Sequence, residues 1–136
     1  TPRGTSPTFY AVPAAIGAKI ARPDRPCLCV TGDGSSLPSL SELATVKKYN
    51  IPVVFLVYNN NSFGVLEEYM TKRYGLEGVM DLSNPDFVKL AQAFGIKSVR
   101  ARTVDDLGRA FRKEITWQEP FVIEFDFPIF PPPWQI

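Results

Sequence analysis

Short apolar runs alternate with segments of helical periodicity along this chain of 136 residues. We expect strands over the runs Cys27 to Val30, Val53 to Tyr58 and Phe121 to Phe125, and a further strand at Ile96 to Val99. We expect helices over Ala11 to Ala21, Ser39 to Val46, Val65 to Tyr74 and Phe87 to Phe94, and a last helix opened by Thr103 with Leu107, Ala110, Phe111 and Ile115 inward. Strands that alternate with helices favour βαβ units. The pattern predicts an α/β fold, a three-layer domain with a mainly parallel sheet and helices on both faces.

Three parts follow from the distribution of turn-forming residues. Residues 1–10 are rich in Thr, Pro, Gly and Ser and form a linker or a displaced N-terminal segment. Residues 11–127 form the α/β domain, and residues 128–136 form a proline-rich tail. We interpret this tail as an extended segment that lies on the domain or on a partner subunit, in preference to a ligand for aromatic grooves. Because the chain starts at Thr1, we expect a fragment, a processed product or an engineered piece.

The charge balance argues against two classes of partner. The chain has 15 basic and 14 acidic residues and no basic stripe, so we expect neither nucleic acid nor an anionic membrane surface as a partner. No apolar run approaches the roughly 18 residues of a transmembrane helix. Cys27 and Cys29 lie two positions apart in an expected strand, which predicts two reduced core thiols and a cytoplasmic location.

The chain contains no histidine. This excludes Ser-His and Cys-His nucleophile pairs and removes the commonest general base. Any chemistry must therefore come from a cofactor, and we assign no catalytic residue to this chain.

Polar residues directly follow the first two expected strands. Asp33 lies within Gly32-Asp33-Gly34-Ser35, and Asn60 follows the second run. Parallel strands joined by a helical crossover end at the same edge of a sheet, which is where open α/β sheets bind ligands. A carboxylate and an amide oxygen suit Mg²⁺, and Gly32 and Gly34 allow a phosphate to approach the backbone. The spacing therefore predicts a site for a metal diphosphate, while an ordinary Asp-Gly turn and a polar Asn loop are the alternatives.

These residues resemble the C-terminal diphosphate-binding domain of thiamine-diphosphate-dependent enzymes. The segment Gly32-Asp33-Gly34 with Asn59-Asn60 is similar to their diphosphate motif, and the stretches Ala11 to Lys19 and Tyr49 to Pro52 resemble the acetolactate synthase and benzoylformate decarboxylase branch. The resemblance implies Mg²⁺ ligands at Asp33, Asn60 and the Ser62 carbonyl. It implies cofactor contacts in the two loops, at Gly32, Asp33, Gly34, Ser35, Asn60, Ser62, Phe63 and Gly64.

The resemblance also implies the cofactors and partners. Thiamine diphosphate and Mg²⁺ would be bound here, and a separate pyrimidine-binding domain or subunit would supply the catalytic glutamate. The substrate would be a small 2-oxo acid, and the chain would act within a homo-oligomer or as a fragment of one. We expect the chain alone to be inactive. A non-catalytic nucleotide-binding domain and an assembly domain are the alternatives.

Two stretches depart from the family pattern. Where relatives carry a large apolar residue and then a glycine, this chain has Thr8 and Phe9, so either this N-terminal stretch is displaced or the pyrimidine end of the cofactor is held poorly. The stretch Val65 to Tyr69 lacks the Gln and Trp of the synthase pattern. A decarboxylase and a synthase therefore both remain possible.

Overall fold

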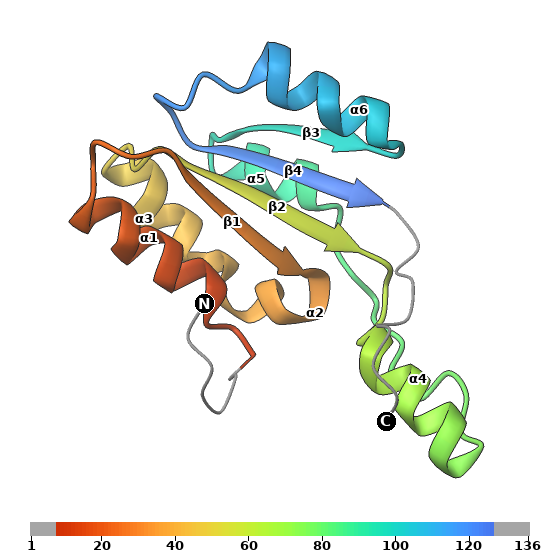
Figure 1. Ribbon diagram of the computed structural model, residues 1–136. Helices are drawn as coiled ribbons and strands as arrows, with labels where there is room; N and C mark the ends of the chain where they lie inside the picture. Colours follow the sequence, from red (N-terminus) through yellow and green to blue (C-terminus); the bar gives the residue numbers. More distant parts are fainter. Residues whose placement is uncertain (1–7, 127–136) are drawn as a thin grey trace.

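The computed structural model describes residues 8–126, and four parallel strands form its central sheet (Figure 1). The strands are β1 (Cys27–Gly32), β2 (Val53–Asn59), β3 (Lys97–Ala101) and β4 (Phe121–Asp126), in the spatial order β1-β2-β4-β3. All four expected strands are present within one or two residues of their predicted ends. The predicted α/β fold with a parallel sheet is confirmed.

Strand β2 lies in the interior of the sheet and pairs with β1 on one side and β4 on the other. Its residues Val53 to Val57 are buried on both faces, as is typical of a central strand in a parallel sheet. Val30 lies beside Leu56, and Gly32 beside Tyr58. The register therefore brings the C-terminal ends of β1 and β2 to the same edge.

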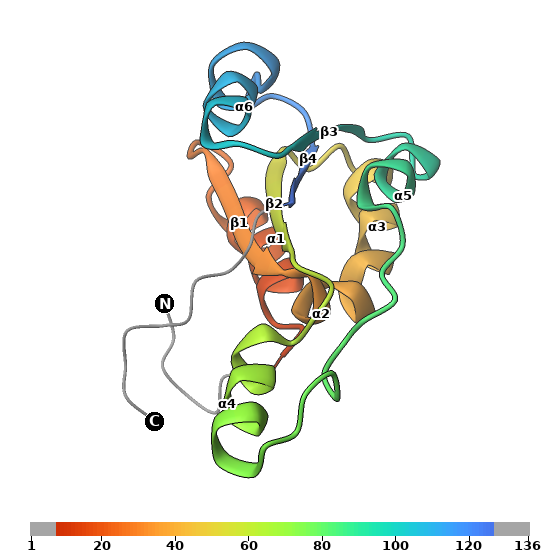
Figure 2. The same cartoon turned by 90° about the vertical axis from the view of Figure 1, so that its right-hand side faces the viewer.

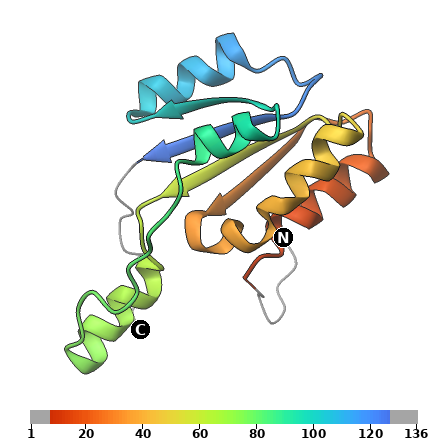
Figure 3. The same ribbon diagram turned by 180° about the vertical axis from the view of Figure 1, so that it is seen from behind.

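Three helices and a 3₁₀ helix cover one face of the sheet. They are α1 (Ala11–Ala21), the 3₁₀ helix Leu37–Glu42, α3 (Leu43–Lys48) and α5 (Phe87–Ala93). Figure 3 shows α3 in yellow and α5 in green on the near side of the strands. Their apolar side chains form one cluster with this face, listed here by its fully buried members: Val12, Leu43, Val46, Val53, Phe55, Val57, Phe87, Ala91 and Val122.

The opposite face is covered by a single helical segment. Helix α6 (Val104–Arg109) continues as a π-helix over Ala110–Glu114, and its side chains contact β2, β3 and β4. Helix α6 begins at the expected Thr103, and Thr103 and Asp106 exchange hydrogen bonds in a capping box. Helices therefore cover both faces, but Leu28 and Val30 of β1 stay 42% and 54% exposed.

The chain is already helical directly after β1, where the sequence predicted a ligand-binding loop. Asp33–Ser36 forms a single helical turn, α2, which leads into the 3₁₀ helix and then α3. The expected helix over Ser39 to Val46 is wrong in its start and regularity, because helical backbone begins directly after β1. Pro38 suits a first helical turn, since it needs no backbone N–H there.

Helix α4 (Gly64–Tyr74) extends away from the sheet beyond the end of β2 (Figures 1 and 2). None of its residues is buried, and Val65 and Leu66 are among its exposed apolar side chains. It ends at Gly75, whose φ of 67° closes the helix in the left-handed conformation. The predicted helix is confirmed, and in the described chain it packs against no core.

Before α1, the three described residues Thr8 to Tyr10 are exposed. Phe9 has a φ of 78°, a conformation that glycine adopts easily and a bulky residue does not. The predicted tail, residues 128–136, and most of the predicted linker, residues 1–10, fall outside the described residues.

Both cysteines lie on the face covered by α1. Cys29 is buried and Cys27 is partly buried, and both thiols are free. Burial raises the pKa of Cys29 to about 12. Within residues 8–126, none of the helices combines the length and apolar character needed to cross a membrane.

Candidate functional site

The C-terminal ends of β1 and β2 bring the two predicted polar loops together. Asp33 follows Gly32 directly, Asn60 follows Asn59, and the two strands are parallel and hydrogen-bonded along their length. Loops at the C-terminal ends of parallel strands are the usual ligand-binding positions of open α/β sheets.

Asp33 is a buried carboxylate with two neutral donors. Only 2% of the residue's surface is exposed. Oδ1 accepts from the Gly34 N–H at 2.8 Å, and Oδ2 accepts from Asn84 Nδ2 at 2.7 Å. In residues 8–126 no Lys or Arg forms an ion pair with it. A buried negative charge without a cationic partner is costly, so the position favours a bound cation.

Asn60 presents a buried acceptor to the same edge. Its Oδ1 has no hydrogen-bond partner among the described residues, although it is shielded from solvent. A Cβ atom added to Gly64 would lie 2.6 Å from Asn60 Nδ2, so only glycine leaves this amide its place. Buried polar atoms without a partner are rare, and a metal ligand is one explanation for this one.

The main chain around Ser62 forms a short antiparallel bridge with Asp81. The bridge uses Phe63 N–H to Met80 O and Leu82 N–H to Asn61 O. Ser62 is therefore the non-hydrogen-bonded position of the pair, and its own carbonyl points out of the bridge. Oxygen from a carboxylate, an amide and a main-chain carbonyl is a donor set that fits Mg²⁺.

The two loops also touch through Gly34 and Phe63. A Cβ atom on Gly34 would overlap the Phe63 ring, so the absence of a side chain lets the ring lie on the backbone. The Gly34 N–H donates to Asp33, and the Ser35 hydroxyl has no partner among residues 8–126. Gly32 has open space around its Cα and an extended backbone. All eight residues predicted for the cofactor thus lie at one edge of the sheet, in the two segments that follow β1 and β2.

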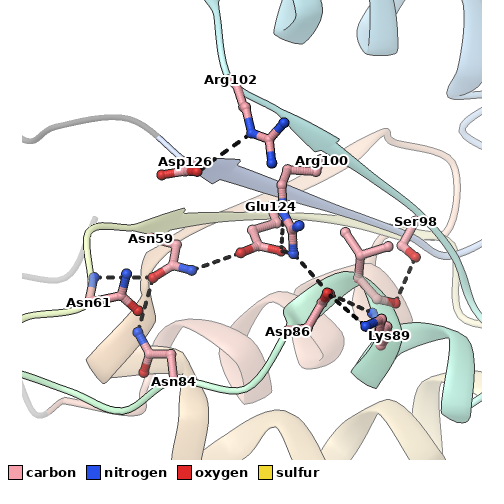
Figure 4. A network of polar contacts seen from close by, with 11 residues as sticks. Asn59, Asn61, Asn84, Asp86, Lys89, Ser98, Arg100, Arg102, Glu124 and Asp126 are labelled. Atoms are coloured by element: carbon pink, nitrogen blue, oxygen red, sulfur yellow. Dashed lines mark hydrogen bonds and ion pairs between the residues drawn. The ribbon is translucent and has the colours of Figure 1, made fainter.

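Four polar residues beside this site were not among the predicted site residues. Asn84 contacts Asp33 and also donates to Asn59 Oδ1 at 3.0 Å, while Asn59 Nδ2 donates to Glu124 Oε1 at 2.8 Å. Arg100 donates to Glu124 Oε2 through Nε and Nη2, and this carboxylate raises the pKa of Arg100 (Figure 4). One signal was visible in the sequence, because Glu124 is the single charged residue inside the apolar run Phe121 to Phe125.

Comparisons with known proteins agree on one family. The family "Thiamine pyrophosphate enzyme, C-terminal TPP binding domain" matches residues 2–125. A "Probable acetolactate synthase large subunit" of Methanococcus aeolicus is 36% identical over 118 residues, which are 85% of this chain and 20% of the relative. The acetolactate synthase large subunit of Haemophilus influenzae is 35% identical over 123 residues, 89% of this chain and 20% of that protein.

A solved structure gives the same answer. The thiamine diphosphate-dependent 4-hydroxybenzoylformate decarboxylase of Rhodococcus jostii RHA1 superposes with a TM-score of 0.79 at 32% identity, covering 88% of this chain and 23% of that one. The chain thus spans about a fifth of the length of the curated relatives it matches. This chain belongs to the thiamine pyrophosphate enzyme family and is a C-terminal TPP-binding domain of the acetolactate synthase and decarboxylase-like type.

Proposed function

We propose that the chain binds the diphosphate of thiamine diphosphate through Mg²⁺ held by Asp33, Asn60 and the Ser62 carbonyl. The observation that carries this proposal is the pair of buried oxygen donors at one sheet edge. The Asp33 carboxylate has no cationic partner among the described residues, and Asn60 Oδ1 has no partner there at all. A divalent cation would satisfy both groups at once.

The other predicted residues would surround the diphosphate. Ser35 and the backbone of Gly32 and Gly34 would face its oxygens, and Phe63 and Gly64 would close the second loop beside Asn60. Thiamine diphosphate supplies carbanion stabilisation when bound, and the protein supplies binding, orientation and electrostatics. Asp33 and Asn60 would fix the position of the diphosphate, which is the contribution this chain makes to the chemistry.

We further propose that turnover of a small 2-oxo acid requires a pyrimidine-binding domain or subunit, which would supply the catalytic glutamate in a cytoplasmic oligomer. Two exposed apolar surfaces support an association of this kind. Leu28 and Val30 lie uncovered on edge strand β1, and α4 exposes Val65 and Leu66. Exposed apolar surface of this kind is typical of protein–protein contacts when it is contiguous.

Calorimetric titration of the full chain tests the binding proposal. We expect thiamine diphosphate to bind when Mg²⁺ is present, weakly without it, and in preference to ADP. Asp33→Ala should abolish the effect of Mg²⁺, whereas Asp105→Ala, an exposed carboxylate on α6, should leave it unchanged. Equal binding by wild type and Asp33→Ala would disprove the metal assignment.

A separate assay tests the need for a partner. The purified chain should not decarboxylate pyruvate or benzoylformate by itself. Activity should arise only when a chain carrying a pyrimidine-binding domain is added. Turnover by the chain alone would contradict this part of the proposal.

A further inference from the structure

A network of hydrogen-bonded polar side chains, here called the polar network, crosses the sheet from β3 to the segment after β1. Glu124 on β4 is 3% exposed, and its carboxylate accepts from Arg100 at 2.8 and 3.1 Å on one oxygen. Its other oxygen accepts from Asn59 Nδ2 at 2.8 Å. Asn84 then connects Asn59 to Asp33, through bonds of 3.0 and 2.7 Å. Figure 4 shows the part of the polar network that runs from Arg100 through Glu124 and Asn59 to Asn84.

The order of donors and acceptors along the polar network allows only one orientation for the side-chain amides of Asn59 and Asn84. Glu124, ionised beside Arg100, can only accept, so Asn59 must turn its NH₂ group toward it. The Asn59 oxygen then faces Asn84 and the Asn61 N–H, which donates to it at 3.2 Å. Asn84 must therefore offer its NH₂ group, and the same nitrogen reaches Asp33 Oδ2. Reversing any one amide would set donor against donor or acceptor against acceptor.

We propose that Asn84 is a positioning residue for Asp33. The Arg100–Glu124 pair fixes the orientation of the Asn84 amide through Asn59. The proposal rests on the metal-binding function proposed above for Asp33. Asn84 orients the carboxylate with a neutral donor, which leaves the full negative charge available to a cation. A Lys or Arg at this place would neutralise Asp33 and compete with the metal.

A second observation points from Asn84 toward a ligand. Once both hydrogens of its NH₂ group are used, its Oδ1 remains buried without a partner in the described part of the chain. Mg²⁺ keeps several water molecules in its coordination shell, and such a water is a donor that this oxygen could accept from. Outer partners of metal ligands tune affinity by roughly 10- to 100-fold.

Mn²⁺ with thiamine diphosphate is the probe for the test on the full chain. Asn84→Ala should weaken Mn²⁺ binding by roughly 10- to 100-fold and change the electron paramagnetic resonance line shape of the bound ion. Ser83→Ala removes an exposed neighbour in the same loop and should change neither. If wild type fails to bind Mn²⁺, the proposed function and the positioning role both fail. If wild type binds and Asn84→Ala binds as tightly with the same spectrum, the positioning role alone is refuted.

Glu124→Gln changes little in shape and tests whether Glu124 acts on Asp33 through Asn59 and Asn84, a route that we call the relay. When its oxygen faces Arg100, its NH₂ group confronts that of Asn59, so Asn59 and Asn84 must turn and set an oxygen against Asp33. We expect weaker Mn²⁺ binding in the wild-type background and no further loss when Asn84 is already alanine. An equal loss in both backgrounds would show that Glu124 acts by another route, and would overturn the relay.

Discussion

Substitution of Gly34 by alanine should destabilise the protein because the new methyl group needs the space of the Phe63 ring. Overpacking costs about 1–3 kcal/mol, and alanine in the α2 turn returns about 1 kcal/mol of helix propensity. Phe63 is half-buried and can partly swing away, which favours the middle of that range. We expect a net loss of about 1 kcal/mol in the free energy of unfolding, measured by urea denaturation with circular dichroism.

Two further variants make the sign of the effect decisive. Gly32→Ala adds the same methyl group at an extended position with nothing within 4 Å, so it should stabilise by about 0.5 kcal/mol through the unfolded chain. In a Phe63→Ala background the obstacle is gone, and Gly34→Ala should then stabilise by about 1 kcal/mol. The cycle gives a coupling of about 2 kcal/mol between the two sites. If Gly34→Ala behaves like Gly32→Ala, or if its cost survives without the ring, the contact between the loops is not what the structure shows.

Three other predictions concern backbone strain and titration. Phe9→Gly should be more stable than Phe9→Ala by about 1 kcal/mol in urea denaturation, the reverse of the usual order, because φ is 78°. Cys29 should resist iodoacetamide at pH 8.5 in the native protein and react in urea, since its pKa is raised to about 12. The raised pKa stabilises the folded protein below pH 9, and this contribution should fade as the pH rises toward 12. Asp86→Asn should lower stability above pH 4 but not well below it. The Lys89 N–H and then Arg100 lower the pKa of Asp86, so the carboxylate's contribution to stability is lost as the pH falls through that pKa. Equal stability of the two Phe9 variants, rapid native labelling of Cys29, or a loss in Asp86→Asn that does not depend on pH would contradict these predictions.

Strands β1, β2 and β4 could be predicted because each is a largely apolar run between turn-forming residues. Parallel β2 is buried on both faces, so its sequence Val53 to Val57 has no polar residue. The common edge for Asp33 and Asn60 then follows from topology, since strands joined by a helical crossover point the same way. The same logic could not give the identity of the ligand, which came from resemblance.

The helical turn at Asp33 could not be predicted from local preference. Gly-Asp-Gly-Ser is a sequence typical of loops, and a four-residue helix gains little from its own hydrogen bonds. In the structure it is the first turn of a longer helical path, and Leu40, Leu43 and Val46 further along that path are buried against the sheet. Tertiary packing therefore decides the backbone at Asp33.

The cap of α5 is Asp86, which accepts from the Lys89 N–H, and Asn84, two residues earlier, was not among the predicted site residues. Its contact with Asp33 joins positions 51 residues apart. No periodicity in the sequence carries that information, because the contact depends on where the loop before α5 crosses the sheet edge. Glu124 was the better clue, since a charged residue in a buried strand requires partners.

The energetics of Glu124 bear on what the polar network contributes. A buried ion pair loses hydration on both partners, and its replacement by apolar residues of similar size is often neutral or stabilising. Stability alone is therefore a weak reason for a carboxylate between Ile123 and Phe125 in the buried part of β4. Orientation is a stronger one, because an apolar residue at this position would remove the acceptor that holds the Asn59 NH₂ group in place. On this argument, the pair with Arg100 acts mainly on the geometry of Asp33, and its loss should show first in metal binding.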